Sequence, residues 1–312
     1  MLQRRSLLAG SLVSSSLYGS LYGSLSASVL APALLLGACT VAPDADHADA
    51  EAPMAMPLKT RPRMAWVFSS GGPRGFVHVG VLKGLHELGL KPDLLVGASV
   101  GSLVAVMYAS GRPVPEIVET ALDLQLTGLG RLAVGGDARF SGAGIASLVR
   151  REINDTMLQD LRIPAVCVAV RRKDGQIVGF NTGDAGLAVQ ASSAIEGQFT
   201  PVRIRGEQYV DPDLYLPLPV RLARQLGARK VLSVDASAHE DKAPEGAQRF
   251  RTSDLKKRTL TAPDALAADI NLHPDFGYFV NLSRDFRERA INAGYRATLA
   301  AASNLIALHA RT

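Results

Sequence analysis

The sequence predicts an α/β fold with a mostly parallel central sheet and helices on both of its faces. Two observations predict it: short apolar runs alternate with longer helix-like segments, and glycine-bearing turns follow two of the apolar runs. The expected strands are residues 64–69, 94–96, 165–170, 176–181 and 230–235. The expected helices are residues 75–88, 102–110, 115–122, 144–154 and 218–226. Ligand sites in such sheets are expected at the carboxyl ends of the strands.

Two longer segments complete the expected domain. Residues 237–263 are polar and charged, which predicts an exposed loop. Residues 281–309 carry an amphipathic pattern, which predicts a helix packed on the core. Of the 312 residues, 47% are hydrophobic, and the roughly 250 residues after the N-terminal part are enough for one large core or two small ones. Aromatic residues make up 5% and the formal net charge is +5, which disfavours a nucleic-acid surface and suits mild attraction to anionic lipid.

Residues 1–38 have the pattern of a bacterial export signal. Two adjacent arginines precede a long stretch without charge, and small residues precede Cys39. The ending Leu-Gly-Ala-Cys resembles a lipoprotein lipobox, which implies lipidation of Cys39, and the arginine pair resembles a twin-arginine signal. The resemblance implies a membrane anchor facing the periplasm, with Thr40 favouring the outer membrane. The alternative, an uncleaved anchor helix, is disfavoured by the frequent serine and glycine residues.

Residues 39–62 lack periodicity and predict a lipidated, flexible tether ahead of a domain at 63–312. If Cys39 is lipidated, Cys167 has no disulfide partner within the chain. The apolar run around Cys167 predicts a buried strand position for it.

Ser99 stands in Gly-Ala-Ser-Val-Gly, between an apolar run and a helix-like segment. A serine at such a strand–turn–helix exposes its hydroxyl near a helix N-terminus, as in a nucleophile elbow. Gly97 and Gly101 relieve the crowding of a tight turn. The five-residue pattern alone is a weak signal, because it arises by chance in many chains.

A glycine-rich turn reading Ser-Gly-Gly-Pro-Arg-Gly occupies residues 70–75, after the first expected strand. Backbone N–H groups of such a turn at a helix start can serve as an oxyanion hole or as a phosphate cradle. The turn could also be simple chain punctuation. It matches neither the P-loop nor the dinucleotide-binding pattern. Further along, Asp211-Pro212-Asp213 reads in isolation as an ordinary polar turn.

Together these segments resemble the patatin-like phospholipase family, whose pattern is a glycine-rich loop with an arginine, then Gly-x-Ser-x-Gly, then Asp-Gly-Gly or Asp-Gly-Ala. Residues 191–201 resemble a further stretch of that family. The resemblance implies a three-layer fold, no cofactor, no metal, and a dyad of Ser99 as nucleophile and Asp211 as its acid–base partner. The oxyanion loop implied by it consists of Gly71, Gly72, Pro73, Arg74 and Gly75.

The resemblance implies a lipid acyl hydrolase of the phospholipase A, lysophospholipase or esterase type, acting on membrane lipid through an acyl-serine intermediate. The sequence departs from the family's pattern at Ser70, Gln190, Glu196, Pro212 and Asp213. These departures leave open a weakened enzyme or a non-enzymatic lipid-binding lipoprotein.

A serine–histidine mechanism also stays open. Ser99, then Asp211 or Asp235, then His239 or His273, satisfies the chain order of an α/β-hydrolase triad. The paired loops disfavour this alternative. A phosphate-binding role for the glycine-rich turn is a third possibility.

Overall fold

The computed structural model describes residues 45–310 except 125–127 and 133–137. The expected export signal at 1–38, and Cys39, lie outside these residues. Within the part described, no helix combines the length and apolar character needed to cross a bilayer.

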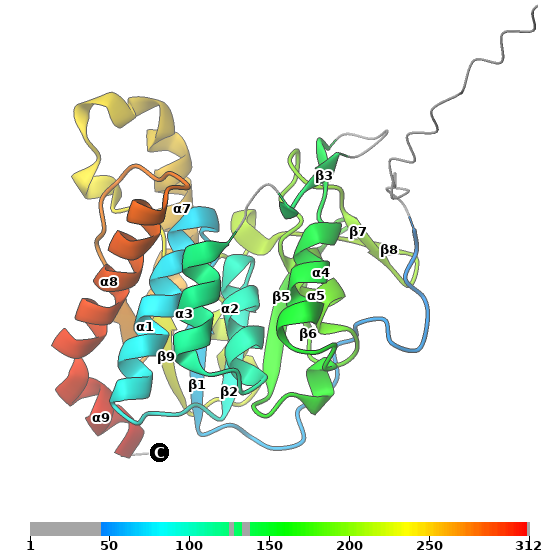
Figure 1. Cartoon of the computed structure of the whole chain (residues 1–312), viewed down its shortest axis with the longest axis horizontal. Helices are drawn as coiled ribbons and strands as arrows, with labels where there is room; N and C mark the ends of the chain where they lie inside the picture. The colour runs from blue at the N-terminus through cyan, green and yellow to red at the C-terminus, as the bar shows by residue number, and fades with distance from the viewer. Residues whose placement is uncertain (1–44, 125–127, 133–137, 311–312) are drawn as a thin grey trace, which may run out of the picture. The chain divides into compact units, whose positions relative to one another are not determined.

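An eight-stranded sheet forms the centre of the domain in the described part of the chain (Figure 1). Strands β10, β9, β1, β2 and β5 lie side by side in that order and run parallel. Strands β6 and β8 pair antiparallel with β5, and β7 pairs antiparallel with β8. The strands are β1 Met64–Phe68, β2 Leu94–Ala98, β5 Ala165–Arg171, β6 Gln176–Phe180, β7 Val202–Ile204, β8 Glu207–Val210, β9 Lys230–Val234 and β10 Ile270–Leu272. A separate hairpin joins β3 Arg131–Leu132 to β4 Phe140–Ser141.

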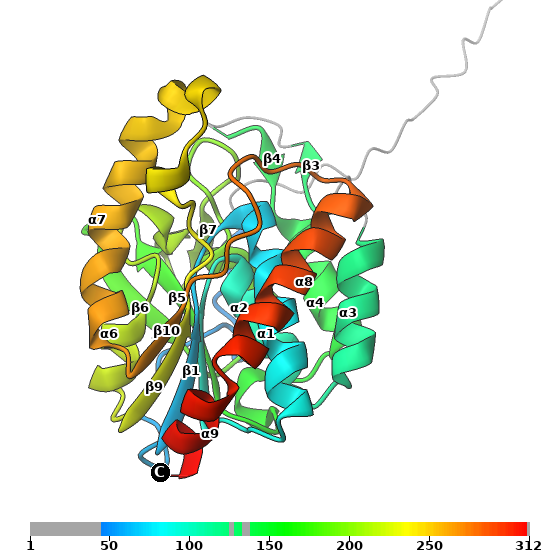
Figure 2. The same cartoon turned by 90° about the vertical axis from the view of Figure 1, so that its left-hand side faces the viewer.

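Helices cover both faces of the sheet, which Figure 2 shows nearly edge-on. Strand β1 supplies both cores, because its side chains alternate: Trp66 and Phe68 belong to one hydrophobic cluster, and Ala65 and Val67 to the other. Helices α6 and α7 lie on the second face, and α1 and α8 pack together on the first. The helices are α1 Phe76–Glu87, α2 Val100–Ala109, α3 Val114–Asp123, α4 Ala143–Glu152, α5 Ala185–Ser192, α6 Val220–Gln225, α7 Arg251–Ala267, α8 Arg284–Ala300 and α9 Ala302–Ala310.

The expected sheet and helices are confirmed to within a few residues, but the loop expected at 237–263 is wrong. That stretch contains two short 3-10 helices and most of α7, which includes Pro263. Polar contacts, rather than a strong apolar stripe, attach α7 to the domain. The buried Asp264 carboxylate accepts hydrogen bonds from the backbone N–H and the guanidinium of Arg221 on α6. The sequence pattern does not indicate this helix, because tertiary polar contacts such as the Arg221–Asp264 ion pair, rather than an apolar face, hold it against the fold.

The single amphipathic helix expected at 281–309 is in fact two helices, α8 and α9, which meet at Ala301. Both pack on the core as expected, with Phe286 and Leu305 fully buried. The last helix is fastened by Trp66, whose indole N–H donates to Nε2 of His309 over 3.1 Å. His309 Nδ1 in turn donates to the carbonyl of Leu305, and burial lowers the pKa of the ring.

Residues 45–62 lie along the domain surface, so the expectation of a free tether does not hold for them. Backbone hydrogen bonds join His47 to Arg203 and Arg205 beside β7, and Met54 to Thr182 after β6. Ala52 is 1% exposed. In Figure 1 this segment is the blue strip at the edge of the sheet. Residues 39–44 lie outside the described part.

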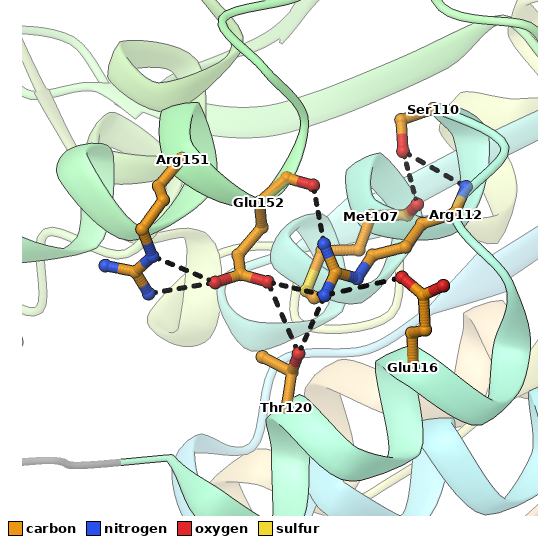
Figure 3. Close-up of polar contacts among 7 residues, drawn as sticks. All are labelled: Met107, Ser110, Arg112, Glu116, Thr120, Arg151 and Glu152. Carbon is orange, nitrogen blue, oxygen red and sulfur yellow. Dashed lines mark hydrogen bonds and ion pairs between the residues drawn. The ribbon is translucent and has the colours of Figure 1, made fainter.

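Arg112 joins the three helices α2, α3 and α4 (Figure 3). Its guanidinium, in the link after α2, donates to the backbone carbonyl of Glu152 over 3.0 Å and pairs with Oε2 of the same residue at 3.0 Å. Thr120 and Glu116 on α3 complete the cluster at 3.4 and 3.7 Å. The Glu152 side chain is 10% exposed, so its charge depends on these partners.

Arg112→Met should lower the free energy of unfolding by about 2 kcal/mol, because charge-assisted hydrogen bonds to a nearly buried carboxylate are lost. Arg151→Met is the matched control. Arg151 contacts the same carboxylate, but its side chain is 67% exposed, and its loss should change stability by less than about 1 kcal/mol. Urea unfolding followed by circular dichroism measures both. Equal effects of the two substitutions would contradict this account.

Candidate active site

Ser99 lies at the sharp turn between β2 and α2, as expected. Its backbone has φ 54° and ψ −125°, a conformation that side-chain-bearing residues rarely adopt. A Cβ on Gly97 would lie 2.4 Å from the carbonyl oxygen of Gly101, and one on Gly101 would lie 2.4 Å from that of Phe68. Both glycines are therefore required by the close approach of backbones, which holds the serine in its strained position.

A second serine, Ser192 at the end of α5, fixes the turn. The backbone N–H of Ser99 donates to Ser192 Oγ over 2.9 Å, and that hydroxyl donates to the carbonyl of Val168 over 2.5 Å. Ser102 Oγ donates to the Ser99 carbonyl over 2.6 Å. Sequence reasoning gave Ser192 no role of its own. The signal was its place in the stretch 191–201 that resembles the family.

Asp211 follows β8, and the sheet brings it beside Ser99. Strand β5 is the shared neighbour: its Val168 pairs with Ala98 at the end of β2, and its Val170 pairs with Val210 at the end of β8. The Asp211 side chain is buried. Its Oδ1 accepts a hydrogen bond of 2.8 Å from the backbone N–H of Asp213.

The Asp211 carboxyl group has a pKa raised to about 7. Burial is the main cause, and it outweighs the lowering effect of the nearby Ser99 hydroxyl. The contact between the Ser99 hydroxyl and the Asp211 carboxyl does not have the geometry of a standard hydrogen bond. Oδ2 of Asp211 is buried and has no partner of good hydrogen-bond geometry among the described residues. The carboxyl therefore keeps one acceptor atom free to take a proton at neutral pH.

The glycine-rich turn forms a short 3-10 helix, Gly72–Gly75, directly before α1. Within the described residues, the N–H groups of Gly71 and Gly72 make no turn or cap hydrogen bond. Gly72 has φ 53° and lines the same cavity as Ser99. The oxyanion loop expected from the sequence includes Pro73 and Arg74. Pro73 has no N–H to donate, and the Arg74 N–H already donates to the Gly71 carbonyl over 3.1 Å, so neither supplies a free donor.

The Arg74 side chain contacts the segment before α8 rather than the cavity beside Ser99. It donates to the backbone carbonyls of Gly277 and Tyr278, and its guanidinium lies 5.3 Å from the ring centre of Phe276. Burial lowers its pKa, and Asp254 partly offsets this. Arg74 thus ties the glycine-rich turn to the segment before α8.

An apolar cavity of about 620 Å³ opens from Ser99. Ionisable side chains are absent from its lining as far as the structure describes the chain. The walls come mainly from α2, α3, α4 and the segment after α5. Representative lining residues are Val100, Leu103, Met107, Ile117, Ile145 and Phe199.

No histidine lines this cavity or hydrogen-bonds Ser99 in the described part of the chain. His239 and His273 instead stack on each other, with ring centres 3.8 Å apart. His273 Nε2 contacts the carbonyl of Ser237 at 3.0 Å. His78 is buried, and burial lowers its pKa to about 4, so it stays neutral. The described residues contain no cluster of three or more side chains suited to hold a metal ion.

Comparisons with known proteins support the fold and show the family. An NTE family protein of Mycobacterium tuberculosis, itself uncharacterised, is 29% identical over 223 residues, which cover 69% of this chain and 61% of that protein. The lysophospholipase NTE1 of Mycosarcoma maydis is 28% identical over 186 residues, 57% of this chain and 10% of that protein. The chain thus spans 61% of the mycobacterial relative's length.

The crystal structure of VipD from Legionella pneumophila has a TM-score of 0.55 at 13% identity, covering 84% of this chain and 71% of VipD, and it shares the fold. The family model described as patatin-like phospholipase matches residues 66–224, more than half of the chain, and includes both Ser99 and Asp211. The chain belongs to the patatin-like phospholipase family.

Proposed function

We propose that the protein is a lipid acyl hydrolase in which Ser99 and Asp211 form a catalytic dyad. The observation that carries the proposal is the facing of a strained serine hydroxyl and a buried carboxyl of pKa about 7, at one end of an apolar cavity. Membership of the patatin-like phospholipase family agrees with lipid hydrolysis.

In the proposed reaction, Ser99 Oγ attacks the acyl carbonyl carbon while its proton passes to Oδ2 of Asp211. The N–H groups of Gly71 and Gly72 donate to the oxyanion, and each such donor contributes about 3–4 kcal/mol of barrier lowering. The C–O bond to the alcohol breaks, and the leaving oxygen takes the proton from Asp211. Water then attacks the acyl-serine ester, with Asp211 again accepting and returning a proton.

The cavity supports a long acyl chain as the group transferred. Its volume of about 620 Å³ lies within the usual range for ligand pockets, and apolar side chains dominate its walls. One relative is named as a lysophospholipase, which agrees with an ester of a single long chain.

Exposed apolar side chains at the cavity support a substrate presented by a membrane. Leu282 is 51% exposed and Phe140 is 37% exposed, and both line the cavity. Phe279 and Val280, in the segment before α8, are 53% and 43% exposed. Such side chains can enter the lipid interface and bring the cavity to the acyl chains.

Ser99→Ala should abolish labelling by a fluorophosphonate probe and lower fatty acid release from lysophospholipid at least roughly a thousandfold, because the nucleophile is lost. Gel fluorescence and mass spectrometry of released fatty acid measure the two effects. His239→Ala and His273→Ala are the controls and should retain both activities. Lipid binding without fatty acid release by the unmodified protein would favour a non-enzymatic lipid carrier instead.

The hydrolysis rate should rise with pH through about 7 and then level off, since Asp211 must be ionised to accept the serine proton.

The raised pKa of Asp211 in the folded state also links this residue to stability. Its contribution to the free energy of unfolding is fully present below the pKa of the unfolded state and is lost as pH rises through about 7. Asp211→Asn should therefore abolish turnover yet stabilise the fold more at pH 8 than at pH 5. Thermal melts at both pH values test this, and a larger gain at pH 5 would contradict it.

We also propose that residues 1–38 direct export and that a lipid on Cys39 anchors the protein to a bacterial membrane, the outer membrane being favoured, with the domain facing the periplasm. The lipobox-like ending supports this. Cys39→Ser should abolish incorporation of labelled palmitate and move the protein from the membrane to the soluble fraction. Cys167→Ser is the matched control, because Cys167 is buried and should leave labelling unchanged. Palmitate on the Cys39→Ser variant would refute the assignment.

A further inference from the structure

Two residues that depart from the family's pattern, Ser70 and Asp213, contact each other. Ser70 Oγ donates to Oδ1 of Asp213 over 2.5 Å. The ammonium group of Lys257, on α7, donates to the same carboxylate oxygen and lies 2.9 Å from Ser70 Oγ. Three segments distant in sequence therefore meet at one carboxylate: the turn after β1, the turn after β8, and a helix outside the family match.

The contact is shielded from water more than an exposed ion pair such as Lys242–Asp275. The Lys257 side chain is 16% exposed and that of Asp213 is 35% exposed, whereas the pair Lys242–Asp275 is 56% and 44% exposed. Burial raises the pKa of Asp213, but Lys257 and Ser70 outweigh burial, and the pKa is lowered overall. Asp213 is thus ionised, and its charge depends on Lys257 for compensation.

In the described part of the chain Lys257 makes no hydrogen bond or ion pair with Ser99 or Asp211, but it contacts Ser70 and Asp213, which adjoin the proposed oxyanion donors and the proposed base. The backbone N–H of Asp213 donates to Oδ1 of Asp211. Ser70 directly precedes Gly71, whose N–H we assign to the oxyanion hole. Fixing Asp213 to Ser70 therefore fixes the spacing between the base and the oxyanion donors.

We propose that Lys257 is a positioning residue of the dyad: by neutralising Asp213 and joining it to Ser70, it locks the two active-site turns together and shields Asp211 from a second negative charge. The proposal rests on the proposed function. It also explains the departures, since an aspartate where the family has glycine requires a countercharge, and α7 supplies one.

The electrostatic part follows from the charges that face Asp211. The negative Asp213 raises the pKa of Asp211 and the positive Lys257 lowers it, so the two charges of the pair act on Asp211 in opposite directions. Lys257 also lowers the pKa of the neutral His78 on α1, and Asp235 after β9 raises it. The small pocket beside Lys257 is lined in addition by charged Arg74, Asp254 and Lys256.

The test compares Lys257→Met, Asp213→Asn and the double substitution by the pH dependence of fluorophosphonate labelling at Ser99. Lys257→Met leaves the negative charge of Asp213 uncompensated, which raises the pKa of Asp211. The rise of the labelling rate with pH (the acidic limb of the profile) should therefore move to higher pH. Asp213→Asn leaves Lys257 uncompensated, so the limb should move to lower pH. The double variant, neutral like the pair, should return close to the parent profile. A shift of one pH unit appears as a tenfold change in labelling rate at low pH.

Lys256→Met is the matched control, because Lys256 is the exposed neighbour of Lys257 on the same helix and should leave the profile unchanged. Lys257→Arg should retain the parent profile. Single variants that shift the limb in the same direction, or a double variant no closer to the parent than either single one, would overturn the proposal. A loss of stability without a change in profile would also overturn it, by reducing Lys257 to a structural role.

A readout without turnover separates this proposal from the proposed function. The Asp211 carboxyl carbon can be titrated by ¹³C NMR in the Ser99→Ala background, with Asp211→Asn for assignment. Opposite shifts of the Asp211 titration in the two single variants would support the charge coupling even if the parent protein showed no labelling. Unchanged titrations would refute the coupling even if the parent protein hydrolysed lipid.

Discussion

The close approach of backbones around Ser99 is the constraint on which the site depends. Gly101 lies so near the carbonyl of Phe68 that no side chain fits between them, and Gly97 is equally confined by α2. This contact presses the start of α2 against the end of β1, which forces the serine into its strained conformation. It also sets the distance between the nucleophile and the glycine-rich turn, since that turn begins where β1 ends. The chemistry is thus set by packing of main chain on main chain.

Burial of a carboxyl beside the serine is the second element, and its free-energy cost is part of its use. A carboxyl group at the surface would be ionised at neutral pH and a poor proton acceptor, whereas burial brings the pKa of Asp211 to about 7. The same burial makes any further charge nearby consequential. Asp213 stands two residues away, where Lys257 compensates its negative charge and Ser70 donates a hydrogen bond to it.

Local signals in the sequence predicted the serine turn well, because Gly97, Ser99 and Gly101 act within five residues of one another. No local signal predicted the role of Asp211, which followed only from the resemblance to a family. Its place beside Ser99 depends on β8 running antiparallel to β5, and strands of three or four residues such as β7 and β8 leave a weak pattern. Helix α7 was missed for a related reason: Lys257 and Asp264 owe their roles to partners on distant segments, which a one-dimensional pattern does not contain.

The hydrogen bond between Trp66 on β1 and His309 on α9 has a practical consequence. Trp66 is the single tryptophan of the chain, it lies in the central strand β1, and its indole N–H is bonded to His309. Protonation of His309 would place a proton on the nitrogen that accepts this bond, so acid should loosen the last turn of the chain at this point. The intrinsic fluorescence of the protein therefore reports optically how firmly helix α9 packs against β1.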